Sequence, residues 1–392
     1  MGIVVANFMD SSLVDLKKKG VFSGVAETYN PNCAYESVLH FTPHERDLSL
    51  AGDLASHRIE LFSHPVTGLQ PRKVVRTVMR LARIFRRRGV DIVRGRLPYM
   101  GSLMGTIAAR LTGRPAVVSL GGDNRIGQER GNTYYLGSRS LSYGIEWLTL
   151  RLVSRIIVPN RFTFDYVASI IGAARAQRKC VVIPWLSPPV PESDPEDAGR
   201  LAAFDVAPDR LVVPIVGFVN RYKYSDVLFD ALAEGPLQAP DGRTALFCFL
   251  GDGPLREEGE ARFADRSDVR FLGWQDRSVV QTFLRRADLV LVPMSGFVLL
   301  EAASLGKAII SSRVEWHGEV IRDGETGYLV EPTQPQAWRD AIGQALKEEP
   351  ERLARMAARV RALYEDEFAL TVAVAREVAL YESLTGKSAV TP

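Results

Sequence analysis

Two cations follow a buried apolar run in the second half of the chain, in the sequence GFVNRYKYSD after residues 211–216. Gly217 permits a tight turn at the end of the expected strand, and Arg221 and Lys223 stand where the next helix should begin. Cations beside the backbone N–H groups of a helix start form an anion site, and guanidinium and ammonium groups complement phosphate in different ways. The pattern favours a phosphate-binding loop, with two solvated loop cations as the alternative.

A carboxylate stands inside an otherwise apolar helical segment, PMSGFVLLEAASLGKAIISS. A strand is expected at 289–292, and a short loop, 294–296, leads into a helix that begins near Phe297. The N–H groups of its first turn would favour a diphosphate. Glu301 follows among apolar neighbours, and a carboxylate is seldom buried without a partner. A ribose diol would supply two hydroxyl donors to it, and the alternative partner is a nearby Lys or Arg.

Two other strand ends in this half are candidates for contact with a ligand. The run 245–250 ends in GDGP, where Gly251 and Gly253 would let the backbone approach a ligand closely. An ordinary turn explains the same residues equally well. The run 269–272 contains Phe271 and ends at a glycine, and its backbone N–H and C=O groups would be available to the edge of a nucleobase.

The elements that must position these residues are short apolar runs, rich in Val, Ile and Leu, that alternate with helical patterns. Strands are expected at 2–7, 91–94, 115–120, 155–159, 181–185, 211–216, 245–250, 269–272, 289–292 and 308–311. Helices are expected at 72–89, 101–112, 139–154, 161–171, 226–233, 278–286, 298–305 and 335–347. This alternation indicates an α/β fold with parallel sheets covered on both faces. We expect two doubly wound, Rossmann-like domains facing a cleft, with ligands beyond the carboxyl ends of the strands.

The domain boundaries follow from composition. Residues 1–190 form the first domain, and residues 191–209, rich in Pro and acidic residues, read as a linker. Residues 210–350 form the second domain, and the tail from residue 351 is helical.

The composition restricts the class of protein. The chain has 392 residues, 46% of them hydrophobic, which excludes a disordered chain. No apolar run is long enough to span a bilayer, and no basic stretch precedes an apolar one at the N-terminus, so we expect a cytoplasmic protein. Cys33, Cys180 and Cys248 are isolated in the sequence, which fits a reducing compartment and offers no metal-ligand spacing.

Charge is distributed unevenly along the chain. Residues 1–190 contain 26 Lys and Arg against 13 Asp and Glu, whereas the remainder contains 23 against 33. The stretch PRKVVRTVMRLARIFRRRG carries eight cations and no acid, among them Arg80, Arg83, Arg86 and Arg87. We interpret these four arginines as an acceptor-side or membrane-facing surface.

The same stretch has an apolar stripe at helical spacing, formed by Val75, Val78, Met79, Ala82 and Phe85. A basic amphipathic helix can lie on an anionic membrane, where it would bring the protein to a lipid-linked saccharide. The alternative is a solvated helix that packs its stripe on its own sheet. Nucleic acid is not expected as a partner, because no binding motif is present and the other half is acidic.

The order of these features resembles the C-terminal domain of the family 4 retaining glycosyltransferases, which have the GT-B fold. The resemblance covers about 130 residues and rests on the glycine and basic loop, GDGP, VRFLG, ADLVLVP, the GF loop, LLEAASLGKAIISS and EVIRDGETGYLVEP. The helical end resembles the segment that crosses back to the N-terminal domain in that fold. The first half fits more loosely, through segments such as DIVRGRLPYMGSLMGTIAARLTGRPAVVSLGGD.

The resemblance implies a nucleotide-diphospho-sugar donor, no metal and no other cofactor, and retention of the anomeric configuration. Lys223 matches the diphosphate-binding lysine, with Arg221 beside it, and Glu301 matches the glutamate that holds the ribose. The backbone near Phe297 would face the diphosphate or the sugar. The donor site inferred from the residues and the resemblance together comprises Gly217, Gly251, Gly253, Phe271, Ser295, Gly296, Phe297, Val298, Leu299 and Glu301.

The sequence departs from the family pattern at three places. Phe218 stands where the family usually has the arginine of the basic loop, so Arg221 would replace it. Ser295 lies nearest to the place of the first of two paired glutamates, which normally handles the donor sugar. Gly121 occupies the place of a common histidine, and we expect Asp123 to contact the acceptor or the sugar instead.

These observations predict a retaining glycosyltransferase that moves a sugar to a saccharide or lipid-linked acceptor, in the synthesis of a surface polysaccharide or glycolipid. A nucleotide-sugar epimerase of similar build is one alternative. A glycosyltransferase-like subunit without activity is another, because two of the family's usual site residues are replaced.

Overall fold

The structure is a computed structural model that describes residues 2–18, 22, 25–64, 66, 70–129, 138–185, 189–294 and 296–390. The chain forms two compact units, one made of Met1–Leu186 with Thr371–Pro392 and the other of Ser187–Leu370. Each unit contains one parallel sheet, as the alternation of apolar runs and helices predicts. Within the described residues, no helix has both the length and the hydropathy needed to cross a membrane.

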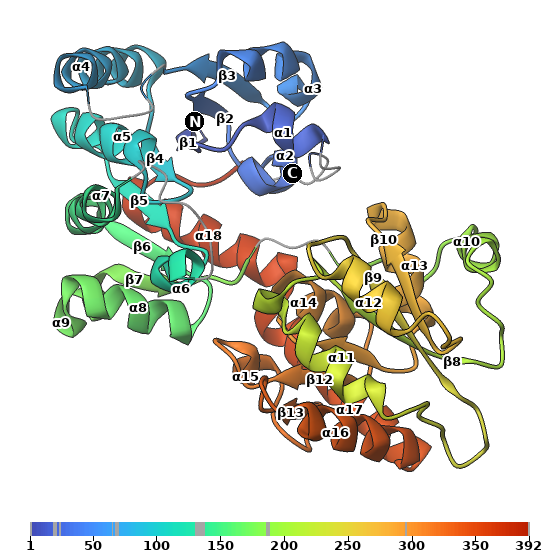
Figure 1. Ribbon diagram of the computed structural model, residues 1–392. Coiled ribbons are helices and arrows are strands. Elements are labelled where there is room, and N and C mark those ends of the chain that lie inside the picture. The colour runs from blue at the N-terminus through green and yellow to red at the C-terminus, as the bar shows by residue number, and fades with distance from the viewer. Residues whose placement is uncertain are drawn as a thin grey trace. The chain divides into compact units, whose positions relative to one another are not determined.

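The first unit contains a seven-stranded parallel sheet with the order β3-β2-β1-β4-β5-β6-β7 (Figure 1). Its strands are β1 (Val4–Phe8), β2 (Ser37–Thr42), β3 (Ile59–Ser63), β4 (Ile92–Gly95), β5 (Ala116–Ser119), β6 (Arg155–Val158) and β7 (Cys180–Val182). Alternate residues along β1 and just before it enter different cores: Ala6 and Phe8 pack on one face of the sheet, and Val5 and the preceding Ile3 pack on the other. The sheet is therefore covered on both faces, which explains its continuous apolar strands.

Helices cover both faces of this sheet. They are α1 (Leu13–Lys18), α2 (Val25–Tyr29), η2 (Pro31–Cys33), η3 (Glu45–Leu50), α3 (Ala51–Ala55), α4 (Pro71–Arg88), α5 (Met100–Leu111), α6 (Asn124–Glu129), α7 (Arg139–Leu152), α8 (Arg161–Ile171), α9 (Ala173–Lys179) and α18 (Leu370–Thr385). A buried ion pair between Arg94 and Glu377, with 3.1 Å between Nη2 and Oε2, holds α18 on the sheet. Tyr35 donates a hydrogen bond to the other carboxylate oxygen of Glu377. The last helix of the chain is thus part of the first unit.

The second unit contains a six-stranded parallel sheet with the order β10-β9-β8-β11-β12-β13. Its strands are β8 (Leu211–Val216), β9 (Ala245–Leu250), β10 (Val269–Gly273), β11 (Val290–Val292), β12 (Ile309–Ser312) and β13 (Tyr328–Val330). Its helices are α10 (Asp197–Ala203), η4 (Arg221–Lys223), α11 (Ser225–Ala233), α12 (Arg256–Arg262), α13 (Arg277–Arg286), α14 (Gly296–Ser304), α15 (His317–Val320), α16 (Pro335–Lys347), α17 (Pro350–Leu363) and the π-helix η5 (Tyr364–Phe368). In both units the first strand in sequence lies inside the sheet, with the chain winding outward on either side.

Residues 191–209, expected as a linker, include the helix α10. This helix packs on α13, where the Asp197 carboxylate accepts hydrogen bonds of 2.6 Å from the Arg285 guanidinium. The tail expected from residue 351 divides between the units: α17 belongs to the second unit, and α18 from Thr371 onward belongs to the first.

Candidate functional site

The candidate donor site lies at the topological switch point of the second sheet, between β8 and β11. These two strands are neighbours, but the chain continues from β8 to β9 on one side and from β11 to β12 on the other. Doubly wound sheets bind ligands beyond the carboxyl ends of two such strands, where the chain winds away in opposite directions. The sequence predicts a phosphate site in both of these loops, and the topology places the two loops next to each other.

The loop after β8 is pinned by its own side chains and by its neighbour. Asn220 caps η4, with its Oδ1 accepting a 2.9 Å hydrogen bond from the Lys223 backbone N–H. The Val219 N–H donates to the Asp252 carbonyl at 2.9 Å, which ties the loop to the turn after β9. Lys223 is therefore held on a short, ordered turn at the switch point.

Gly251 and Gly253 explain how the two loops come so close. A Cβ atom at Gly251 would lie 1.9 Å from the Gly217 carbonyl oxygen, and one at Gly253 would lie 2.3 Å from the Val219 carbonyl oxygen. Both distances are far below van der Waals contact with backbone atoms that cannot move away easily. The sequence suggested that these glycines allow close approach to a ligand, and the structure shows a close approach of backbone to backbone.

Lys223 is half-buried and lies in a mixed electrostatic environment. Burial lowers the pKa of its ammonium group, and the nearby Glu315 carboxylate opposes that shift. Burial together with the charge of Lys223 lowers the pKa of His317 to about 4, so this imidazole is neutral near pH 7. His317 is held by a 2.7 Å hydrogen bond between its Nδ1 and the Ser311 hydroxyl. The sequence did not single out Glu315 or His317, because only the fold brings the loop after β12 to Lys223.

Arg221 begins η4 and is exposed. It has no ion-pair partner within the described part of the chain. Its guanidinium is thus available to an anion arriving beside Lys223, which is the arrangement that the basic loop predicted.

The helix α14 begins at Gly296, close to the start expected from the sequence. The first N–H groups of a helix have no acceptor inside it, so they carry a partial positive charge at this end. Val298 and Leu299 are buried in the core, which leaves only their backbone for any contact with a donor, whereas the Phe297 side chain is exposed. Ser295, expected near the donor sugar, lies outside the described residues.

Glu301 is buried in α14 and pairs with a cation. Its side chain is 7% exposed, and its Oε1 lies 2.9 Å from Nη2 of Arg277, the first residue of α13. Burial raises the pKa of Glu301, and Arg277 opposes that shift. The structure therefore shows the ion pair that the sequence left as the alternative to a ribose contact. Arg277 itself is 47% exposed, so the pair stands at the edge of the protein, where a ligand can reach it.

Phe271 has a packing role in the structure. Its ring stacks on that of Phe249, with 4.7 Å between the ring centroids, and meets Phe229 edge to face. Its side chain thus belongs to the core of the second unit, and only its backbone remains for a nucleobase.

Asp123 lies in the first unit, in the loop after β5. Arg125 donates a 2.7 Å hydrogen bond to its Oδ2 and a second one to its Oδ1. The carboxylate that the sequence assigned to acceptor or sugar is therefore already engaged by an arginine two residues away.

The basic helix α4 carries Arg80, Arg83, Arg86 and Arg87 on its exposed side, as expected. The apolar stripe was predicted with the wrong phase, because Val75 and Met79 are 64% and 45% exposed. The face that packs on the sheet consists instead of Val78, Leu81, Ala82 and Phe85. Leu81 was missing from the predicted stripe, and its burial rotates the apolar face away from Val75.

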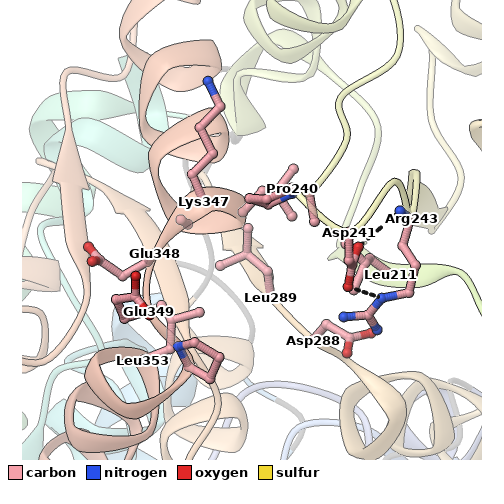
Figure 2. Close-up of a pocket in the computed structure, with 14 residues that line it drawn as sticks. Leu211, Pro240, Asp241, Arg243, Asp288, Leu289, Lys347, Glu348, Glu349 and Leu353 are labelled. Carbon is pink, nitrogen blue, oxygen red and sulfur yellow. Dashed lines mark hydrogen bonds and ion pairs between the residues drawn. The ribbon is translucent and has the colours of Figure 1, made fainter.

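A pocket of about 440 Å³ also occurs in the second unit, but at the opposite edge of the sheet. Figure 2 shows its lining, which includes Leu211 and Leu289 just before or at the amino ends of β8 and β11. Glu348 and Glu349, between α16 and α17, complete one wall, and Arg243 pairs there with Asp241. Ligands of doubly wound sheets lie at the carboxyl edge, so the donor is not assigned to this pocket.

Each of the two units matches a known protein family. The family described as Glycosyl transferases group 1 matches residues 202–362, and the family described as Glycosyltransferase Family 4 matches residues 37–185. The two matches cover most of the first sheet and all of the second. The chain belongs to the family 4, group 1 glycosyltransferases. The family expected from the ordered motifs is thereby confirmed.

The chain spans about half the length of the curated relatives that it matches. The D-inositol 3-phosphate glycosyltransferase of Mycolicibacterium smegmatis is 30% identical over 52% of this chain and 48% of its own length. The alpha-D-kanosaminyltransferase of Streptomyces kanamyceticus is 26% identical over 45% of this chain and 46% of its own length.

Solved structures confirm the GT-B fold over the whole chain. HepE from Anabaena, in complex with UDP, matches with a TM-score of 0.74 and 18% identity over 98% of this chain and 100% of its own. Sucrose-phosphate synthase from Thermosynechococcus elongatus matches with a TM-score of 0.70 and 17% identity over the same shares of the two chains. A Listeria monocytogenes chain assigned as a UDP-N-acetylglucosamine 2-epimerase also matches, with a TM-score of 0.56, 15% identity and 98% coverage of both chains. The fold alone therefore does not separate transfer from epimerisation.

Proposed function

We propose that this chain transfers a sugar from a nucleotide-diphospho-sugar to a hydroxyl of a saccharide or lipid-linked acceptor, with retention of the anomeric configuration. The observation that carries the proposal is the placement of Lys223 and the start of α14 on the two sides of one switch point. A diphosphate placed there would meet an ammonium group, the Arg221 guanidinium and the N–H groups of a helix start. Relatives and structural neighbours that are named for sugar transfer, or that contain UDP, support this choice of donor.

In this reaction the acceptor hydroxyl oxygen forms a bond to the anomeric carbon on the face from which the diphosphate departs. The bond between that carbon and the diphosphate oxygen breaks, and its electron pair stays on the leaving diphosphate, which takes the hydroxyl proton. The negative charge on the diphosphate grows as this bond breaks. Lys223, Arg221 and the first turn of α14 would stabilise that charge more strongly in the transition state than in the bound donor.

The partial burial of Lys223 fits this role. Burial lowers its pKa, and a nearby negative charge, Glu315, raises it. A bound diphosphate would act in the same direction as Glu315 and would keep the ammonium group protonated during the reaction. Glu315 offsets part of the cost of burying the cation, and a bound donor would offset more of it.

A panel of UDP-, GDP-, dTDP- and ADP-sugars tests the proposal. We expect one donor class to give release of the nucleoside diphosphate, together with a glycosylated product of unchanged anomeric configuration, when a membrane and saccharide extract is added. Interconversion of the nucleotide sugar without acceptor would show an epimerase. Donor binding without release or interconversion would show a subunit without activity.

We also propose that α4 docks the protein on an anionic membrane surface. Arg80, Arg83 and other cations of α4 are exposed beside the exposed Val75 and Met79. Arg86 reaches the end of α5, with which α4 packs side by side (Figure 1), and donates a 3.1 Å hydrogen bond to the Leu111 carbonyl. Cations around a few exposed apolar side chains are typical of a surface that lies on a lipid headgroup layer.

Sedimentation with vesicles tests this docking surface. We expect salt-sensitive binding to phosphatidylglycerol vesicles and none to phosphatidylcholine vesicles. The double substitution Arg80→Glu and Arg83→Glu should weaken binding on the order of thirtyfold or more, since each cation near an anionic surface contributes about 1 kcal/mol. The matched control is Arg355→Glu with Arg359→Glu, two exposed arginines on α17, which should bind as the wild type does. Equal loss in both double variants, or binding that is insensitive to salt, would refute the docking of α4.

A further inference from the structure

A second pocket, of about 350 Å³, lies at the carboxyl edge of the first sheet. Its lining comes from the ends of four neighbouring strands: Asp10 follows β1, His44 follows β2, Val66 follows β3, and Tyr99 and Met100 follow β4. The strands β1 and β4 are neighbours from which the chain winds in opposite directions, so this pocket lies at the switch point of the first unit. The sequence singled out none of these residues.

Asp10, which lines this pocket, and His64, which lies beside it, have buried polar atoms without hydrogen-bond partners within the described residues. The Oδ1 atom of Asp10 is buried and accepts no hydrogen bond, while its Oδ2 receives only a long one, 3.4 Å, from the Gly101 N–H. His64 is 2% exposed, and neither of its ring nitrogens has a hydrogen-bond partner. A buried polar group without a partner costs about 1–3 kcal/mol, so two in one place indicate groups kept for a ligand.

Gly101 brings these two groups to the same point. A Cβ atom at Gly101 would lie 2.5 Å from Asp10 Oδ1 and 3.1 Å from His64 Nε2. Both atoms thus converge on the space beside the start of α5, which only a glycine leaves open. Tyr99 lies near the same carboxylate. Burial raises the pKa of Tyr99, and the charges of Glu146 and Asp10 raise it further.

The protonation states define what the pocket can bind. Burial raises the pKa of Asp10 to about 6, against the opposing effects of the Gly101 N–H and His44, and lowers the pKa of His64 to about 4. Near pH 7 Asp10 is therefore a carboxylate that accepts hydrogen bonds, and His64 beside the pocket is a neutral imidazole that can donate one and accept one. Hydroxyl groups satisfy both, because each can donate and accept.

The lining residues also exclude a class of ligand. Among the described residues, the pocket lining contains a carboxylate and no lysine or arginine. A phosphate would meet the Asp10 carboxylate with no lysine or arginine to offset it and only the His44 imidazole nearby, which is unfavourable at short range in a partly desolvated site.

We propose that this pocket binds the acceptor as an uncharged polyhydroxylated ring, with Asp10 and His64 hydrogen-bonded to its hydroxyl groups. That the bound ring is a sugar acceptor rests on the transferase function proposed above, but binding of the ring does not require a nucleotide sugar. In this mode of binding, the Asp10 carboxylate selects a neutral acceptor over a phosphorylated one.

Ligand-detected NMR on the full chain, without any nucleotide sugar, tests the proposal. The probes are neutral monosaccharides and cyclitols, such as glucose, mannose, galactose and myo-inositol, together with their monophosphates. We expect at least one neutral ring to bind, and its monophosphate to bind more weakly. Asp10→Asn should weaken that binding about tenfold or more, because a hydrogen bond to a charged group contributes about 1.5–3 kcal/mol.

Two other variants complete the design. Gly101→Ala should abolish binding by filling the space between Asp10 and His64, and it should still fold because the methyl group meets side-chain ends, not backbone. Asp53→Asn removes an exposed carboxylate of the same unit, paired with Lys17, and should bind as the wild type does. The proposal is overturned if no neutral ring binds, if the monophosphates bind more tightly, or if Asp10→Asn and Gly101→Ala leave binding unchanged. Retained ring binding in a protein that transfers no sugar would refute the transferase function alone.

Discussion

Lys223→Ala is expected to lower kcat for sugar transfer by about a hundred- to a thousandfold, the loss typical of removing one group that stabilises transition-state charge. The physical reason is that Lys223 stands on a pinned turn at the switch point, where the departing diphosphate would gain charge. Within the described residues its side chain forms no ion pair whose loss would destabilise the fold, and burial lowers its pKa. The melting temperature should therefore change little. The measurement is steady-state kinetics with the donor found by the panel, beside a thermal unfolding curve.

Lys347→Ala is the matched control, because Lys347 is an exposed lysine at the end of α16 in the same unit. It should retain wild-type kinetics. If Lys223→Ala transferred sugar at the rate of Lys347→Ala, Lys223 would have no part in the reaction.

Glu301→Gln is expected to weaken nucleotide binding by about ten- to a hundredfold, since a carboxylate that accepts two ribose hydroxyls makes charge-assisted hydrogen bonds which an amide cannot reproduce. Burial raises the pKa of Glu301, so the ion pair with Arg277 keeps the carboxylate ionised and ready to accept. Calorimetric titration with a nucleoside and with its diphosphate separates this role from that of Lys223. Glu301→Gln should weaken both ligands equally, whereas Lys223→Ala should weaken the diphosphate alone.

Arg277→Gln provides the comparison for a purely structural ion pair. If Glu301 served only to pair with Arg277, the two substitutions would shift the melting temperature alike and leave nucleoside affinity unchanged. A fall in nucleoside affinity that is larger in Glu301→Gln than in Arg277→Gln supports the ribose contact.

Much of the fold could be predicted because its strands are buried on both faces and appear as continuous apolar runs. The strands β2, β3 and β13 were not predicted from the sequence, and each of them departs from this pattern. The strand β2 carries the buried polar His40, whose ring is hydrogen-bonded to Asn7, and β3 exposes Glu60 at the edge of the sheet. The strand β13 has only three residues. Local patterns did not reveal them because their stability comes from neighbouring strands.

The site residues likewise fall into those that could be selected from the sequence and those that could not. Lys223 and Glu301 could be selected from the sequence because each stands out within its own segment: a cation after a strand, and a carboxylate in an apolar helix. Arg277, Asp10 and His64 could not, because their importance comes from partners that the fold brings together from distant segments. The phase error in α4 has a similar origin, since Val75 and Leu81 are equally apolar and only contact with the sheet decides which is buried.

The central claim is that the switch point of the second sheet binds the diphosphate of a sugar nucleotide. Calorimetric titration of the wild-type chain with UDP, GDP, dTDP and ADP tests it most directly. We predict that at least one of these binds at a single site. Lys223→Ala should weaken its binding about tenfold or more while Lys347→Ala should not, since Lys223 would donate charge-assisted hydrogen bonds to the diphosphate. Absence of binding by all four, or equal affinity in Lys223→Ala and the wild type, would contradict the account.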